Sequence, residues 1–299
     1  MQRAHLVVNP FARGVTPAST RAVARVLGEG FKLEVSATTS ALAGTGVARE
    51  AVENGAELVV TFGGDGLVNE VVNGLAGTPA ALGVVPGGTM NVFARSLGLP
   101  RAPLEAARRL VAKAESGTSR VVDLGVANGR FFTFACGVGF DAEAAARVNH
   151  HHRTKHRFGE PYFYAAALAT LVTSYAVRAP FLRCEGDFDP QRAVMAIALV
   201  GRPYAYLAGR PVRLGGGSWP GSGLSLFVLR DLRLWRLPEY ALGAFLTGRF
   251  GAGSSLLEGL PWIRVASDDP VPAHVDGERL APSSTVEIES AEAALRVVA

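Results

Sequence analysis

The first 120 residues alternate between short apolar segments and segments with helical periodicity, and this alternation limits the folds available to the chain. Apolar runs such as "HLVVN" at 5–9 and "AELVVTF" at 56–62 are typical of buried strands. Strands that alternate with helices pair in parallel, because each helix carries the chain back across the sheet. The pattern predicts a parallel sheet with helices on both faces. One predicted helix has apolar residues at the i, i+3, i+4 and i+7 positions: Val68, Val71, Val72 and Leu75.

The pattern changes near Arg120, where strand signals become dominant. Asn128-Gly129 separates two β-runs and is a strong hairpin signal, because both residues tolerate positive φ. We therefore predict an α/β chain of two domains, with an N-terminal parallel-sheet domain at 1–120. The second domain, 121–299, is predicted to be antiparallel, β-sandwich-like and interrupted by helices. Its last strand could also return to the first domain. Its further β-runs lie at 194–200, 224–230, 262–267 and 285–289, and its helical segments at 142–148, 162–176 and 237–248.

Composition narrows the function classes. The 299-residue chain is 48% hydrophobic and 19% charged, which is typical of a globular protein. The net charge is +4, and the positive charge is too diffuse for a dedicated nucleic-acid binder. Such a charge is compatible with an anionic ligand or a membrane surface. Cys136 and Cys184 form no CxxC pair, and the start of the chain does not resemble a signal peptide. A cytoplasmic protein is therefore expected, and the apolar run at 162–177 is interpreted as a core or membrane-facing helix.

A glycine-rich turn, Gly63-Gly64-Asp65-Gly66, lies between a predicted strand and a predicted helix. Glycines allow phosphate oxygens to approach main-chain amides, and the helix N-terminus adds partial positive charge. A carboxylate there would repel phosphate unless a divalent cation lay between them, so Asp65 suggests a metal. Asn69 could reach a ribose or a phosphate, and Glu70 complements the helix dipole. The alternative is a tight turn with no ligand.

A second turn of this kind follows the next predicted strand, where Gly87 and Gly88 precede Thr89 and Asn91. Asn9-Pro10 follows the first strand. The carboxyl ends of parallel strands lie at one edge of a sheet, and open α/β sheets bind ligands there. We therefore expect these polar turns to converge on one site.

Taken together, "GGDG" with Asn69-Glu70 and "PGGTMNVFAR" at 86–95 resemble the diacylglycerol kinase catalytic-domain family. This family includes bacterial soluble lipid kinases and, more distantly, sphingosine and ceramide kinases. The resemblance extends over nearly the whole chain, through "VDLG" at 122–125, "GVGFDAE" at 137–143 and "DGE" at 276–278. A GGDG turn alone is shared with NAD kinases and phosphofructokinases, whereas the PGGTxNxFAR segment points to lipid kinases.

The resemblance implies an ATP-dependent lipid kinase that uses Mg²⁺. Asp65 would organise the magnesium, Asp123 would belong to the metal network, and Glu278 would be the general base that takes the proton from the lipid hydroxyl. Asp141 would lie near the lipid headgroup, as in the sphingosine kinase branch. The residues expected to contact ATP are Asn9, Thr38 or Thr39, Gly63, Gly64, Asp65, Gly66, Asn69, Glu70, Gly88, Thr89 and Asn91.

Each acidic residue also has a purely structural interpretation. Asp276-Gly277 can form a simple β-turn that leaves Glu278 solvated. Asp123 can be a residue at the end of a strand, and Asp141 can be a helix N-cap. The chain also departs from the family pattern at Ala12-Arg13, Leu67, Val92 and Ser222. The serine at position 222 puts a structural metal of the second domain in doubt.

Two other functions stay open at this point: an NAD kinase-like small-molecule kinase, and a nucleotide-binding regulator with weak or no catalysis. For a lipid kinase we expect a lipid substrate at the membrane surface, peripheral contact with the inner membrane face and no nucleic acid. The sequence leaves open a homodimer and does not identify the lipid. The segment "HHHRTKH" at 150–156 is interpreted either as a solvated basic loop or as a contact with anionic headgroups, with His152 and His156 as a less favoured metal pair.

Overall fold

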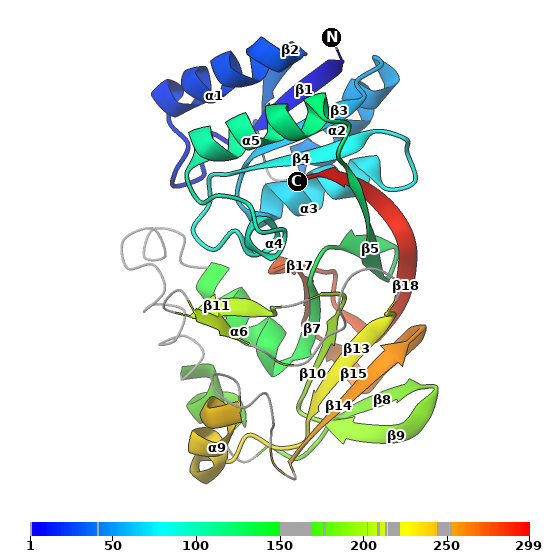
Figure 1. The fold of residues 1–299 in the computed structure, drawn as a ribbon. Helices are drawn as coiled ribbons and strands as arrows, with labels where there is room; N and C mark the ends of the chain where they lie inside the picture. Colours follow the sequence, from blue (N-terminus) through cyan, green and yellow to red (C-terminus); the bar gives the residue numbers. More distant parts are fainter. Residues whose placement is uncertain are drawn as a thin grey trace. The chain divides into compact units, whose positions relative to one another are not determined.

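The structure is a computed structural model that describes residues 2–40, 42–149, 169–175, 178–201, 203–207, 210–212, 214, 222–243, 251 and 253–299. The chain divides into two compact units (Figure 1). The first unit comprises Met1–Leu124 together with Glu292–Ala299, and the second comprises Gly125–Ala291. The chain therefore leaves the first unit and comes back to it with its last residues.

The first unit contains a parallel sheet in the order β2-β1-β3-β4-β18, to which β18 contributes its C-terminal part. Each of the first four strands is separated from the next by a helix, as parallel pairing requires. The prediction of an α/β fold with a parallel N-terminal sheet is confirmed. The elements are β1 Arg3–Val8, α1 Pro17–Gly30, β2 Lys32–Ala37, α2 Ala43–Glu53, β3 Leu58–Gly63, α3 Asp65–Leu75, β4 Ala81–Pro86, α4 Val92–Ser96, α5 Pro103–Glu115, β5 Arg120–Ala127 and β18 Ser283–Val298.

Alternating residues of the strands divide the core of this unit into two layers. Leu6 of β1 and Val60 of β3 pack in one hydrophobic cluster with Leu27 of α1 and Leu110 of α5. Helices α2 and α3 pack against each other, and the four apolar residues predicted to form the inner face of α3 are all buried. Because both faces of the sheet are covered, β3 and β4 are buried along their whole length.

Local signals fix the helix boundaries closely. The sequence predicts a helix with Thr16 as its N-cap and Pro17 at its first position. In the structure Thr16 caps α1 through a capping box with Ser19, and Pro17 occupies the first turn. The sequence also predicts a short helix at 89–97, but this helix begins only at Val92, because Asn91 adopts a left-handed conformation with φ of 47°. The turn before α4 is therefore longer than the sequence suggested.

The second unit is built from antiparallel strands. One sheet has the order β14-β13-β10-β7-β16-β17. In the other, β15 pairs with the first part of β18 and with β8, and β8 pairs with β9. One hydrophobic cluster joins the two sheets through alternate residues such as Val138, Leu226 and Val265, so the predicted β-rich fold is confirmed. The elements are β6 Arg130–Phe132, β7 Ala135–Gly139, β8 Leu182–Gly186, β9 Phe188–Ala193, β10 Met195–Leu199, β11 Ala205–Leu207, β12 Arg210–Val212, β13 Leu224–Leu229, β14 Ser254–Leu260, β15 Trp262–Val271, β16 Ala273–Val275 and β17 Glu278–Arg279.

The predicted hairpin joins β5 to β6. Asn128 and Gly129 both have positive φ, 47° and 80°, and Ala127 pairs with Arg130. The second unit also contains helical segments: α6 Phe140–Asn149, which packs against β7, β10 and β16, a π-helical turn η1 Leu171–Tyr175, a 3₁₀ turn η2 Leu234–Arg236 and α9 Leu237–Leu242. Most of the helix predicted at 162–176 and the whole histidine segment at 150–156 lie outside the described residues.

Candidate active site

Three loops meet at the carboxyl ends of β1, β3 and β4 in the first unit, as the sequence predicts. The amide of Gly87 donates to the carbonyl of Gly63 at 2.7 Å, and the amide of Gly14 donates to the carbonyl of Gly87 at 2.8 Å. The amide of Asn9 donates to the carbonyl of Phe62 at 3.0 Å. Main-chain hydrogen bonds therefore hold the loops together at the sheet edge where open α/β sheets bind ligands.

Glycine is required in these loops for more than ligand approach. A Cβ on Gly88 would lie 2.5 Å from the Cα of Gly64, and a Cβ on Gly14 would lie 2.9 Å from the carbonyl oxygen of Gly87. Gly64 is also the N-cap of α3, and it has no side chain that could accept hydrogen bonds from the first-turn amides. The N-terminus of α3 is thus built without a side-chain cap, which is the arrangement that suits an anion.

Asp65 begins α3 and connects it to α4. Its Oδ1 accepts a hydrogen bond from the amide of Phe93 at 3.1 Å, and the residue is half-buried. Asn91 shapes the same region, since its side-chain amide accepts from the Gly88 amide and donates to the Gly88 carbonyl, both at 2.9 Å. The structure therefore brings together Gly63, Gly64, Asp65, Gly88 and Asn91.

The remaining residues predicted to bind nucleotide differ in exposure. Thr38 is buried, and its amide donates to the carbonyl of Val8 at 2.8 Å, which places it beside the end of β1. Thr39 and Thr89 are exposed, and the Oδ1 of Asn9 accepts from the amide of Phe11 at 2.9 Å. Gly66 lies in the first turn of α3. These positions are at the correct ends of the strands, and their contact with ATP stays a prediction.

Asn69 and Glu70, which are also predicted to contact ATP, have structural partners in the first unit. Asn69 is fully buried, and its carbonyl accepts from the side-chain amide of Asn73 at 2.8 Å. The carboxylate of Glu70 accepts from the amides of Leu42 and Gly44, at 3.0 and 2.8 Å, at the start of α2. Glu70 therefore complements the N-terminus of a neighbouring helix and not only that of its own, a long-range contact that spacing along the chain could not reveal.

Asp123 is buried in β5, and its Oδ1 accepts from the amide of Ala293 at 2.8 Å. Ala293 has a φ of 51° and lies where β18 enters the first unit. The carboxylate therefore anchors the returning segment of the chain.

Glu278, the predicted general base, belongs to the second unit. It is half-buried and is the first residue of β17, directly after a turn at 276–277 in which both residues have positive φ, 52° and 85°. Asp276 is buried, and its carboxylate accepts four hydrogen bonds of 2.7–3.2 Å, from the amides of Thr133, Phe134 and Ala135 and from the hydroxyl of Thr133. The Asp-Gly pair is a β-turn, as one interpretation of the sequence had it, and this turn presents Glu278.

Two residues that sequence reasoning missed contact Asp141. The hydroxyl of Tyr204 donates to its Oδ1 in a short hydrogen bond, and the Nε2 of His274 lies 2.7 Å from its Oδ2. Both Asp141 and His274 are buried. Burial and the neighbouring carboxylate raise the pKa of Tyr204, which keeps its hydroxyl protonated as a donor. His274 lies four residues before Glu278, and proximity to the DGE motif was the one available signal for it.

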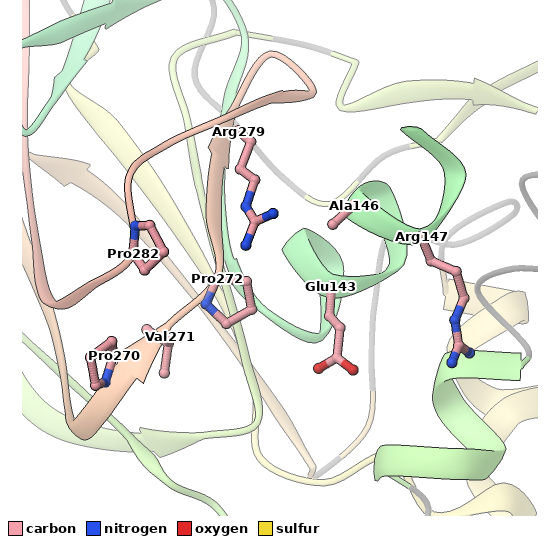
Figure 2. A pocket seen from close by; sticks show the side chains of 8 residues that line it. All are labelled: Glu143, Ala146, Arg147, Pro270, Val271, Pro272, Arg279 and Pro282. Carbon is pink, nitrogen blue, oxygen red and sulfur yellow. The ribbon is translucent and has the colours of Figure 1, made fainter. Parts of the chain in front are cut away.

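A hollow of about 560 Å³ lies in the second unit between α6 and the chain around β16 and β17 (Figure 2). Its walls include Pro270, Pro272 and Pro282 on one side and Glu143 of α6 on the other, with Arg147 and Arg279 as the cationic groups. The carboxylate of Glu143 also accepts from the hydroxyl of Tyr175 at 2.9 Å. An apolar wall with a few charged groups is typical of a site for an amphiphilic ligand.

The structure also shows the surroundings of two departures from the family pattern. Leu67, in place of threonine, is buried, and its side chain lies beside Gly63 and Gly44. Ser222 is half-buried just before β13. In the part of the chain that the structure describes, no group of three His, Cys, Asp or Glu side chains could hold a metal ion.

Asp65 nevertheless fits a Mg²⁺ ion that would be held by one protein carboxylate together with the phosphates of a nucleotide. Mg²⁺ typically takes one or two carboxylates together with phosphates and water, and not a cage made only of protein. Asp65 supplies a carboxylate at a helix N-terminus, beside a turn where no Cβ stands in the way. Among the described residues, no helix is long and apolar enough to cross a membrane.

Comparisons with known proteins agree with the motifs. Residues 3–127 match the model of the diacylglycerol kinase catalytic domain. A diacylglycerol kinase of Bacillus subtilis is 38% identical over 146 residues, which cover 46% of this chain and 46% of that protein. A "Probable lipid kinase YegS-like" protein of Chromohalobacter salexigens is 40% identical over 131 residues, 42% of this chain and 41% of that one. These alignments span less than half the length of either relative.

Solved structures share the fold. A Bacillus anthracis structure aligns with a TM-score of 0.79 at 23% identity, covering 99% of this chain and 97% of that one. Another, described as a diacylglycerol kinase from the same organism, aligns with a TM-score of 0.71 at 21% identity, covering 99% and 96%. At such identities the likeness supports the fold alone, whereas the resemblance to the family rests on the sequence motifs and the matching domain model. Residues 3–127 of this chain therefore match the diacylglycerol kinase catalytic domain, and the rest of the chain shares the fold of the solved structures.

Proposed function

We propose that the protein is an ATP- and Mg²⁺-dependent kinase that phosphorylates a hydroxyl of diacylglycerol or a related lipid. One observation carries the proposal: the uncapped N-terminus of α3 lies beside Asp65 and against the Gly87–Gly88 loop, at the carboxyl ends of β3 and β4. The named activity of the relatives in Bacillus subtilis and Chromohalobacter salexigens supports the same reaction class.

In this mechanism the chain mainly positions groups. The first-turn amides of α3 and the glycine loop would bind the phosphates of ATP, and Asp65 would hold Mg²⁺, which neutralises charge that develops on the phosphoryl group. Glu278 would take the proton from the lipid hydroxyl as that oxygen attacks the γ-phosphorus. The bond from this phosphorus to the β–γ bridging oxygen would break, and ADP would leave with that oxygen. Asp123 would support the first unit by anchoring Ala293.

The second unit offers features for a lipid at a membrane surface. Trp235 is 67% exposed and Leu242 is 52% exposed, and the Arg236 guanidinium lies 4.9 Å from the centre of the Trp235 ring. An exposed tryptophan with an adjacent cation is typical of contact with lipid headgroups. We place the protein at the inner membrane face as a peripheral enzyme, and sedimentation with anionic vesicles should weaken in the Trp235→Ala variant.

The decisive experiment combines an acceptor panel with variants at Asp65. Purified protein with ATP and Mg²⁺ should phosphorylate at least one of diacylglycerol, monoacylglycerol, a sphingoid base or a glycolipid, and should leave NAD unmodified. Asp65→Asn keeps an oxygen for the Phe93 amide but removes the charge, so we expect kcat/KM to fall about 10³-fold, or about 4 kcal/mol, with an unchanged melting temperature. Near-normal turnover of this variant would contradict a metal role for Asp65.

The same assay separates the two alternative functions. Phosphorylation of NAD in preference to every lipid would establish a small-molecule kinase. Binding of ATP without transfer to any acceptor would favour a nucleotide-binding regulator, which is the alternative motivated by the departures at Leu67 and Ser222.

A further inference from the structure

Asp141 has both carboxylate oxygens engaged inside the second unit, by Tyr204 and by His274. His274 in turn accepts, at its Nδ1, a hydrogen bond of 3.2 Å from the amide of Gly277. We propose that His274 is a positioning residue, held by Asp141 and Tyr204, whose Nδ1 fixes the turn that presents Glu278. This inference rests on the proposed function only in so far as Glu278 is the general base.

The hydrogen-bond roles determine the tautomer of His274. A main-chain amide can only donate, so the Nδ1 that accepts from Gly277 carries no proton. The proton of the neutral ring is then on Nε2, where it is donated to Asp141. The carboxylate of Asp141 thus selects the tautomer that leaves Nδ1 available to the turn.

Gly137 provides independent evidence that this network is built into the sheet. It pairs with His274 across β7 and β16. A Cβ at Gly137 would lie 2.6 Å from the Nε2 of His274 and would overlap the Oδ2 of Asp141. The glycine therefore clears the space in which the carboxylate and the imidazole meet, which gives the first glycine of "GVGFDAE" a physical role.

Protonation of His274 would work against the turn. An imidazolium keeps its contact with Asp141, but its Nδ1–H then faces the Gly277 amide and no longer accepts from it. Burial lowers the pKa of His274, but the carboxylates of Asp141, Asp276 and Glu278 together outweigh burial and raise the pKa above 6.5. Among the described residues, Tyr204 and Cys136 also face this cluster, and burial raises the pKa of both, so both stay neutral.

Two substitutions of His274 test its two contacts separately, because each keeps one contact and removes the other. His274→Asn places an amide oxygen near the position of Nδ1 and can still accept from Gly277, whereas it no longer reaches Asp141. His274→Gln reaches toward Asp141 but offers no acceptor at the Nδ1 position. Neither side chain titrates. His5→Asn is a matched control, because His5 lies in β1 of the first unit and contacts Ser36.

The first measurement is amide hydrogen exchange of Gly277 by NMR, expressed as protection factors so that intrinsic pH effects cancel. We expect the Gln variant to lose about tenfold or more in protection and the Asn variant to stay within about threefold of the unsubstituted protein. Protection in the unsubstituted protein should fall on acidification with a midpoint above pH 6.5, whereas the Asn variant should show no such step. Equal protection in all variants, or loss in Asn but not in Gln, would overturn the proposal.

The second measurement is lipid phosphorylation. A shift of Glu278 by about 1 Å is expected to cost about 100-fold, so His274→Gln should lower kcat by about that factor with little change in the lipid KM. His5→Asn should leave both constants unchanged. If the unsubstituted protein phosphorylates no acceptor, the proposed function fails, and the exchange data alone still decide the role of His274.

Asp141→Asn distinguishes positioning from direct substrate binding. An asparagine can keep an oxygen for Tyr204 or His274 but no longer selects one tautomer of the ring. In the positioning role, Gly277 protection and kcat fall together. A raised lipid KM with normal Gly277 protection would instead make Asp141 a ligand of the lipid headgroup and would overturn its assignment here.

Discussion

The candidate site residues of the two units are held in place by different kinds of hydrogen bonds. In the first unit, the loops after β1, β3 and β4 are joined by main-chain hydrogen bonds, and glycines allow close approach. In the second unit, the turn before Glu278 is held by buried side chains, since Asp276 accepts four hydrogen bonds and His274 accepts one.

This difference follows from what each site has to do. A loop that binds phosphate must present main-chain amides, and any side chain at that point would occupy the ligand's position. A general base must be held at a fixed place by its surroundings, and buried hydrogen bonds to side chains provide that rigidity. Adding atoms should therefore damage the first unit, and removing polar atoms should damage the second.

The largest stability effect is expected at Asp276. Asp276→Ala would leave three buried amides and one hydroxyl without their acceptor, which should cost about 3–5 kcal/mol in the free energy of unfolding. Asp276→Asn introduces a residue that tolerates positive φ and keeps one oxygen, so it should cost roughly half as much. The three tryptophans of the chain, at positions 219, 235 and 262, all fall within the residue range of the second unit, so urea unfolding followed by tryptophan fluorescence reports on it directly. A cost below about 1 kcal/mol for the alanine variant would show that the carboxylate does not hold the turn.

A smaller effect is expected when a methyl group is added to the first unit. Gly88→Ala would force the two glycine loops apart, which should cost about 1–3 kcal/mol and abolish nucleotide binding. Gly28→Ala is the matched control, because a Cβ at that exposed position of α1 meets nothing within 4 Å. The control should instead stabilise the unit by about 0.5–1 kcal/mol. Far-ultraviolet circular dichroism during unfolding measures the stability of the helices, and titration with ATP measures nucleotide binding. If the two variants behaved alike, the structure would give no reason for glycine at position 88.

The smallest effect is expected at Glu70 of the first unit, whose carboxylate, like that of Asp276 in the second unit, accepts hydrogen bonds from main-chain amides. Glu70→Ala removes the acceptor for the amides of Leu42 and Gly44 and should cost about 1 kcal/mol. Glu70→Gln keeps one oxygen and should cost less. The KM for ATP should stay unchanged in both. A large rise in that KM without a loss of stability would instead show that Glu70 contacts ATP, as the family resemblance implies.

Much of the first unit could be predicted because its signals are local. Thr16 and Pro17 mark a helix start, and Val68, Val71, Val72 and Leu75 mark a buried helix face whatever surrounds them. The second unit was harder, since β9 and β14 carry polar residues without clear alternation, and β8, although it alternates, is only five residues long. Strands there are stabilised by partners distant in the sequence, and such pairing leaves only a weak mark on any one segment.

The sequence by itself determined the parallel sheet, the glycine turns at its strand ends and the hairpin at Asn128-Gly129, because each depends on residues within a few positions of one another. Only the tertiary structure decided that Glu70 caps α2, that Asp123 anchors Ala293, and that Asp141 meets His274 across 133 positions of chain. A carboxylate selects its partners by distance and burial after folding, so its role cannot be read from its neighbours in the sequence.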